Sequence, residues 1–208
     1  MKNVKDEAAI WVIIILVVGL WLLVLRIHDT ELGLSMKAFQ VLPEVVTLFA
    51  LCYVIFTKWG WRLPVFQGWL VPYPDLQGTW KGEIKSTWIN PETQKPLDPI
   101  PMLLVIRQTF DSINCIMLTA EMNSKSVSAI VKDDDGLKKL SYTYVSEPHL
   151  DVRHRSPIHN GAIALKVVGN PQRLLEGDYW TDRKTTGAVE AQFVSRKLAE
   201  RFDPDWQG

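Results

Sequence analysis

The chain has no excess of either charge. Its 23 lysines and arginines balance 23 aspartates and glutamates, and the part after Leu70 is also near neutral, with 17 basic and 18 acidic residues. A general nucleic-acid-binding protein normally carries a basic excess, so we expect no nucleic-acid partner. An anionic ligand would have to be bound by a few local cations, because the chain has no overall positive field.

Cysteine and enzyme motifs are equally scarce. The two cysteines, Cys52 and Cys115, lie in an apolar and a strand-like run, which fits buried thiols better than a disulfide framework or a metal site. There is no glycine-rich phosphate loop, G-x-S-x-G, H-E-x-x-H or paired C-x-x-C. His149, His154 and His159 recur at a spacing of five, which in a loop imposes no common face. We therefore expect no catalytic residue, metal or cofactor.

Two long apolar runs stand at the beginning of the chain. The first covers residues 8–25, which as a helix spans about 27 Å at ~1.5 Å per residue, close to the ~30 Å of a bilayer core. A signal peptide is the alternative, but no A-x-A-like cleavage site follows. The second covers residues 38–56, where Pro43 and Glu44 are typical of a first helical turn near an interface.

The positive charges that flank these runs indicate an orientation. Lys2 and Lys5 precede the first run, and Lys58 and Arg62 follow the second. The short loop between the runs carries Arg26 and Lys37, but also Asp29 and Glu31. The positive-inside rule therefore favours a membrane hairpin with both termini in the cytoplasm.

The remaining chain alternates between apolar and polar residues, which predicts strands rather than helices. Eight strands are expected, at residues 76–88, 102–109, 113–121, 126–132, 140–147, 162–168, 174–181 and 188–195. Most connections are of hairpin length, which favours an up-and-down barrel over a sandwich. Residues 196–201 are expected to form a short polar helix.

The expected fold is therefore a membrane-anchored all-β protein. Two N-terminal transmembrane helices at 1–62 and a linker at 63–74 precede a small eight-stranded antiparallel up-and-down β-barrel at 75–208. A barrel of this size is filled by side chains or holds one small ligand.

Several side chains of the predicted barrel suit a ligand. The alternation puts Ser126 and Ser128 on one face, and likewise Tyr142 and Tyr144. Facing the lumen, they would offer hydroxyls and rings, together with Gln108. A ring stacked on a base contributes ~1–3 kcal/mol, although buried tyrosines are also ordinary core residues with satisfied hydroxyls.

Two further segments supply cations. In RHRSPIH, Arg153 is the first choice for a phosphate contact, and His159 is a further donor. The alternative is an exposed polar loop that binds no ligand. In EGDYWTDRKTTG we expect Tyr179 to face inward, Trp180 outward, and Arg183 to reach a ligand at the barrel mouth. A hydrolase carboxylate pair could be drawn from Glu176, Asp178 and Asp182. If Tyr179 faces inward, however, strand alternation points Glu176 and Asp178 to solvent.

The order of these features resembles a known family. The two apolar runs lead into PDLQGTWKGEI, IRQTF, a serine-rich strand, LSYTYVSEP, RHRSPIHNGAIAL and LLEGDYWTDRKTTG. This order is similar to that of the two-transmembrane β-barrel effectors of bacterial CBASS anti-phage systems.

The resemblance implies a function that periodicity does not give. The barrel would sense a cyclic dinucleotide made by a CD-NTase, ligand-bound copies would form a homo-oligomer, and the spans would disrupt the lipids of the bacterial inner membrane. The barrel and the N-terminus would lie in the cytoplasm. The alternatives are a membrane-anchored, lipocalin-like carrier of a lipid or other small apolar ligand, and a tethered hydrolase.

Overall fold

The structure is a computed structural model that describes residues 6–29, 36–91, 93–134, 136–169 and 173–207. The chain forms two compact units, Met1–Pro72 and Tyr73–Gly208, whose boundary falls within the predicted linker. That linker is partly folded, because a short 3-10 helix covers Pro64–Phe66; another, at Gly60–Arg62, ends just before the linker. Lys2, Lys5 and Glu31, which entered the orientation argument, lie outside the described residues.

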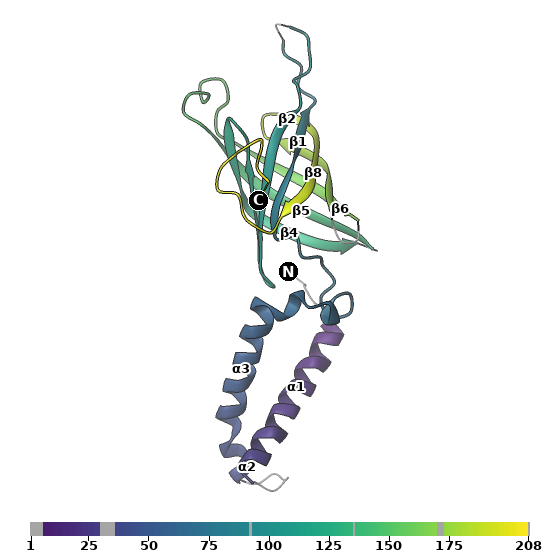
Figure 1. Cartoon of the computed structure of the whole chain (residues 1–208), viewed down its shortest axis with the longest axis vertical. Coiled ribbons are helices and arrows are strands. Elements are labelled where there is room, and N and C mark those ends of the chain that lie inside the picture. Colours follow the sequence, from purple (N-terminus) through teal and green to yellow (C-terminus); the bar gives the residue numbers. More distant parts are fainter. Residues whose placement is uncertain (1–5, 30–35, 92, 135, 170–172, 208) are drawn as a thin grey trace. The chain divides into compact units, whose positions relative to one another are not determined.

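The first unit is a helical hairpin made of α1 (Asp6–Ile27), α2 (Met36–Gln40) and α3 (Leu42–Lys58) (Figure 1). The stretches Ala9–Ile27 and Met36–Lys58 are long and apolar enough to cross a membrane. Only 11% of each is buried, so most of their apolar side chains are not buried by protein. This arrangement fits a pair of membrane spans and would be costly in water.

The helices pack at the end of the hairpin nearest α2. Their buried cluster consists of Val24, Leu25, Ala38, Val41 and Val45. Polar contacts hold the same region together, because His28 Nε2 lies 2.9 Å from Glu44 Oε2 and Trp21 Nε1 donates to Ala38 O at 3.3 Å. Pro43 and Glu44 occupy the first turn of α3, as the sequence predicted.

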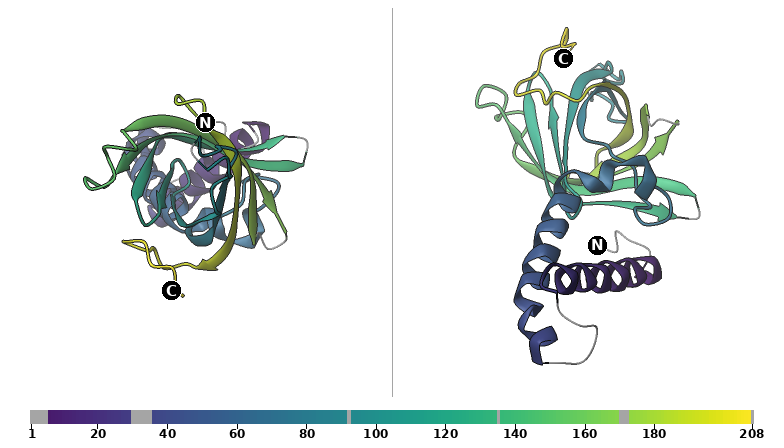
Figure 2. Two further views of the ribbon diagram at one scale, coloured as in Figure 1. Left: turned by 90° about the horizontal axis from the view of Figure 1, so that it is seen from above. Right: turned by 60° about the horizontal axis from the view of Figure 1, so that its bottom comes forward.

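The second unit is a closed antiparallel barrel, which confirms the predicted fold. Its strands are β1 (Gly78–Ser86), β2 (Ile100–Gln108), β3 (Ile113–Leu118), β4 (Met122–Asp134), β5 (Leu137–Pro148), β6 (His159–Val168), β7 (Leu174–Thr181) and β8 (Thr186–Ser195). They follow one another in sequence order, and β1 also pairs with β8 (Figure 2). Each backbone edge is thereby used within the sheet.

The antiparallel strands give the barrel two ends with different chemistry. The glutamine end, where β1 begins and β2 ends, contains Gln108. The tyrosine end, where β5 ends and β6 begins, contains Tyr144, Tyr179 and Arg183; it is the upper end of the barrel in Figure 1. Between the two ends the interior is apolar, and Trp80 packs edge-on against Phe193 with ring centroids 5.3 Å apart.

The C-terminal segment departs from the prediction. Residues 196–201 are irregular rather than helical, and they lie on the outer face of β2 and β3. The contacts join Leu198, Ala199, Phe202 and Trp206 to Leu103, Val105, Ile116 and Leu118. Thr79 fixes the segment, because its Oγ1 donates to Lys197 O at 2.7 Å and accepts from Ala199 N at 2.9 Å. Burial of these apolar side chains outweighs the marginal stability of so short a helix.

Candidate ligand site

The tyrosine end contains two tyrosine rings, each lying against a glycine of the next strand. Tyr144 of β5 pairs with Gly161 of β6, and a side chain at Gly161 would overlap the Tyr144 ring and hydroxyl. Tyr179 of β7 pairs with Gly187 of β8, where a side chain would overlap the Tyr179 ring. The two glycines therefore provide the room in which the rings lie along the barrel wall.

Arg183 lies in the turn between β7 and β8 and reaches the loop between β5 and β6. Its Nη1 donates to Ser156 Oγ at 3.0 Å. The adjacent Asp182 accepts hydrogen bonds from the backbone N and side-chain Nδ2 of Asn160, at 3.0 and 3.1 Å. These bonds hold the turn against the loop and orient the guanidinium, which has five N–H donors in all and so can still bind an anion.

The charge state of this end follows from burial and from its hydrogen bonds. Burial raises the pKa of Tyr144 to about 12; Tyr179 and Asp182 act in the same direction, and Arg183 opposes them. The hydrogen bond from the Asn160 backbone is the first cause that lowers the pKa of Asp182. At neutral pH the site thus presents the neutral phenol of Tyr144 and an Asp182 carboxylate already engaged by Asn160, beside the Arg183 guanidinium.

His159 is the third sequence-predicted residue at this end. It opens β6, is buried, and has Nδ1 3.0 Å from Pro157 O. Because a carbonyl only accepts, Nδ1 carries the hydrogen and Nε2 remains for another contact. His159 also contributes to the lowered pKa of Asp182, which places the imidazole near that carboxylate.

Neutral rings beside a guanidinium suit a ligand that carries both bases and phosphates. The sequence model of one family, described as "Cap15, cyclic dinucleotide receptor domain", matches residues 71–192. The chain belongs to this family. CD-NTase-associated protein 15 of Staphylococcus schleiferi is 24% identical over 148 residues, which cover 71% of this chain and 76% of that protein.

The matched region holds the whole barrel except the last three residues of β8. Within this Cap15-type barrel, Tyr142 lies deeper than Tyr144, and Ser126 is the β4 residue that pairs with Tyr144. Tyr142 and Tyr144 have ring centroids 6.1 Å apart, and Ser126 Oγ accepts a hydrogen bond from Cys115 N at 2.9 Å. The predicted inward orientation of these three residues fits their burial.

Ser128 does not share the face of Ser126, so that prediction was wrong. The β4–β5 register shifts between Ser126 and Ser128, and the extra residue Val127 is 72% exposed. A bulge of one residue reverses the faces of the positions that follow. Ser128 consequently pairs with the exposed Thr143 and points away from the lumen.

Gln108, which was also predicted to contact the ligand, lies at the end of β2 and therefore at the opposite end of the barrel from Tyr144 and Tyr179. Its Oε1 accepts from Leu76 N at 2.7 Å and its Nε2 donates to Pro74 O at 3.0 Å. The amide therefore satisfies backbone groups of the segment that closes this end. Its two functional atoms are used, which leaves a structural role.

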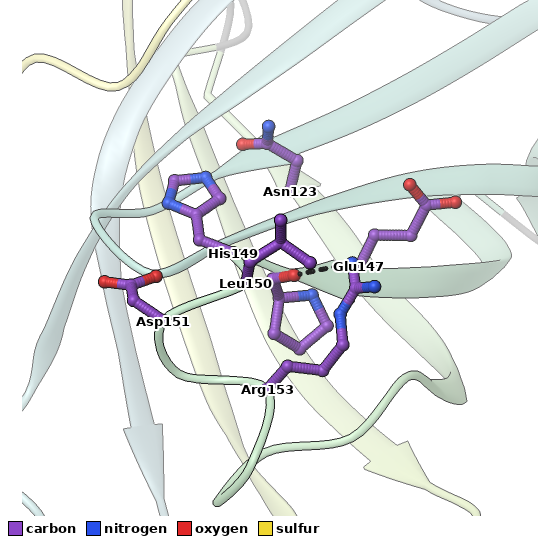
Figure 3. Close-up of a pocket in the computed structure, with 7 residues that line it drawn as sticks. Asn123, Glu147, His149, Leu150, Asp151 and Arg153 are labelled. Carbon is purple, nitrogen blue, oxygen red and sulfur yellow. Dashed lines mark hydrogen bonds between the residues drawn. The ribbon is translucent and has the colours of Figure 1, made fainter.

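The described contacts of Arg153 lie in a surface groove. The residue comes from the loop after β5 and lines an open surface groove of ≈ 530 Å³ with Asn123, Glu147, His149 and Asp151 (Figure 3). Its Nη2 donates to Pro148 O at 3.1 Å. With two carboxylates beside one guanidinium, the groove is electrostatically less suited to a phosphate than the surroundings of Arg183.

Sequence reasoning missed the supporting residues Gly161, Gly187, Ser156 and Asn160. A signal for the glycines was present, because Gly161 and Gly187 precede the buried Ile163 and Val189 by two residues, so strand alternation puts them on the inward face. Ser156 and Asn160 act through residues more than 20 positions away, and no local pattern could have predicted those contacts.

Proposed function

We propose that this protein is the effector of a bacterial CBASS anti-phage system, and that its barrel is a receptor for a cyclic dinucleotide rather than an enzyme. The observation that carries the proposal is the meeting of Tyr144, Tyr179 and Arg183 at one end of a barrel of the cyclic dinucleotide receptor family. The relative's name refers to a CD-NTase, the enzyme class that would supply the ligand.

The chemistry of a cyclic dinucleotide fits these side chains. Its bases can stack on the Tyr144 and Tyr179 rings, each stack contributing ~1–3 kcal/mol. Its phosphates accept charge-assisted hydrogen bonds from Arg183, with His159 Nε2 as a second polar contact. Since the barrel has no positive excess, Arg183 supplies a large share of the attraction.

The proposed membrane step follows from the surface next to the site. Trp180 adjoins Tyr179 on β7, points outward and is 50% exposed. A ligand that fixes Tyr179 also orders the strand that presents Trp180 to a second barrel, which favours a homo-oligomer. Each added copy brings two apolar helices, and their clustering disrupts the lipid bilayer.

In this proposal the barrel and the N-terminus lie in the cytoplasm, and the two helices span the inner membrane. Two spans return the chain to the side on which it began. A second messenger made in the cytoplasm reaches its receptor only there.

Binding by two arginine variants tests the receptor assignment. Arg183→Ala in the full chain should weaken the preferred cyclic dinucleotide about 10- to 100-fold, because a charged hydrogen bond contributes ~1.5–3 kcal/mol. Arg153→Ala is the matched control and should keep wild-type affinity. Calorimetry in detergent, with linear dinucleotides as negative controls, measures both.

Three outcomes would redirect the assignment. Loss of binding in Arg153→Ala alone would move the ligand to the surface groove. Equal loss in both variants would indicate general electrostatic attraction. Wild-type protein that binds no cyclic dinucleotide but takes up a lipid would instead identify a carrier.

Dye release from liposomes tests the membrane step separately. Reconstituted full chain should release dye when the dinucleotide is added, whereas the barrel Tyr73–Gly208 should bind the ligand and release none. The barrel is expected to fold alone, because its sheet closes on itself. Release by the barrel alone, or none from the ligand-saturated full chain, would reject membrane disruption and leave the receptor assignment intact.

A further inference from the structure

Tyr142 carries a buried hydroxyl that the fold does not use. The residue lies mid-way along β5, between Ala129 of β4 and Ile163 of β6, and is 4% exposed. Among the described residues its hydroxyl has no hydrogen-bond partner. An unpaired polar group of this kind destabilises a folded protein, and phenylalanine would fill the same space without that penalty.

A second buried tyrosine shows the usual solution. Tyr73 is 3% exposed, and its hydroxyl donates to Phe110 O at 2.7 Å. The two residues have nearly equal burial and differ in whether the hydroxyl is satisfied. Among the fully buried tyrosine hydroxyls of the described residues, that of Tyr142 is the one without a partner.

The position of Tyr142 links this hydroxyl to the candidate ligand site. Tyr142 and Tyr144 are two residues apart on one strand and share its inward face, with their rings inclined at 58°. Tyr144 is nearer the tyrosine end, so a group that enters there meets Tyr144 first and Tyr142 next. Ser126 of β4 pairs with Tyr144, and its Oγ accepts from Cys115 N and keeps its own hydrogen for a further bond.

The hydroxyl remains protonated under all ordinary conditions. Burial raises the pKa of Tyr142 well above its usual value, and Cys115 and Tyr144 add to the shift. A protonated phenol both donates and accepts a hydrogen bond. It can therefore bind either kind of polar group on the edge of a nucleobase.

We propose that Tyr142 is a specificity-determining contact of this site: one base of the cyclic dinucleotide enters from the tyrosine end, lies against Tyr144 and hydrogen-bonds the Tyr142 hydroxyl with its polar edge. This inference rests on the proposed function and adds which group reads the base. A site that pairs a buried polar group with its ligand discriminates against ligands that leave the group unpaired.

Two Tyr→Phe variants of the full chain in detergent separate this role from a structural one. Tyr142→Phe should melt at the same or a higher temperature than wild type, because an unpaired buried hydroxyl is removed. It should bind the preferred cyclic dinucleotide about 3- to 10-fold more weakly, the effect of one neutral hydrogen bond. It should also discriminate less between members of a panel that differ in one base.

Tyr73→Phe is the matched control and should show the opposite pattern. Loss of its bond to Phe110 O lowers the melting temperature, while the affinity and the base preference stay at wild-type values.

Each remaining outcome overturns the inference. Unchanged affinity and base preference in Tyr142→Phe would show that the hydroxyl does not read the ligand, even though the wild-type protein binds. A lower melting temperature with unchanged affinity would show a structural role. If the wild-type chain binds no member of the panel, the proposed function fails and the inference fails with it.

Discussion

The two ends of the barrel use similar side chains in different ways. At the glutamine end, Tyr73, Gln108 and Arg196 all bond to the chain itself: to Phe110 O, to Pro74 O and Leu76 N, and to Asp75 and Gln77 O. Toward the tyrosine end, the buried hydroxyl of Tyr142 has no hydrogen-bond partner among the described residues, and the described hydrogen bond of Arg183 goes to Ser156. Residue type alone does not distinguish the ends.

The difference shows how a functional end can be recognised. Polar side chains that close a barrel satisfy backbone groups that would otherwise be buried without partners. Polar side chains that bind a ligand must keep donors or acceptors for it, at a cost in stability. The comparison therefore predicts that substitutions at the glutamine end lower stability and that substitutions at the tyrosine end lower affinity.

The largest expected effect on stability is at Gln108. Gln108→Leu leaves the Leu76 N–H and the Pro74 carbonyl without their partner. Each orphaned group costs about 1–3 kcal/mol, so the free energy of unfolding should fall by roughly 2–6 kcal/mol. Urea unfolding measures it, and the affinity of the folded fraction should stay at the wild-type value.

Arg107→Ala is the matched control. Arg107 is next to Gln108 on β2 but is exposed and points outward, so this substitution should change the free energy of unfolding by less than about 0.5 kcal/mol. A Gln108→Leu protein of normal stability that no longer binds ligand would break the comparison. The ligand would then belong to the glutamine end, as the sequence alone suggested for this residue.

The fold was largely predictable because a period of two is a local property. Alternating residues predicted eight strands, and hairpin-length connections predicted their order around the barrel. The bulge at Val127 was not predictable, because one extra residue disturbs the alternation only through its pairing with β5. The prediction of a helix in the C-terminal segment was wrong for a related reason, because Leu198 and Trp206 pack on strands about 90 residues earlier.

The candidate site was predictable in composition but not in arrangement. Tyr144, Tyr179 and Arg183 could be named because strand alternation and a turn indicate which side chains face inward. Which of the arginines meets the tyrosines depends on the path of a loop, and Arg153 turns to the outer groove instead. The hydrogen bonds of Gln108 join it to residues more than 30 positions away, and a periodic sequence pattern cannot predict such contacts.

The smaller expected effect is in alkaline solution, where tyrosines of both ends contribute to stability. Burial is the first cause that raises the pKa of Tyr73, Tyr142 and Tyr144, the last to about 12. In the unfolded chain these groups lose their protons near pH ~10. Above that pH the unfolded state binds fewer protons than the folded one, so the free energy of unfolding falls as the pH rises.

Removing one of these tyrosines should make the free energy of unfolding fall less steeply with pH. The difference is the effect of one proton, about 1.4 kcal/mol per pH unit between the unfolded and folded pKa values of that tyrosine. Tyr73→Phe and Tyr142→Phe are therefore alike in this measurement, although they differ in ligand affinity at pH 7. Denaturant unfolding at a series of pH values between ~9 and ~11 gives the slope. An undiminished slope in Tyr142→Phe would mean that its phenol ionises within the folded barrel, and the hydroxyl could then not be sealed in the lumen as the comparison of the two ends requires.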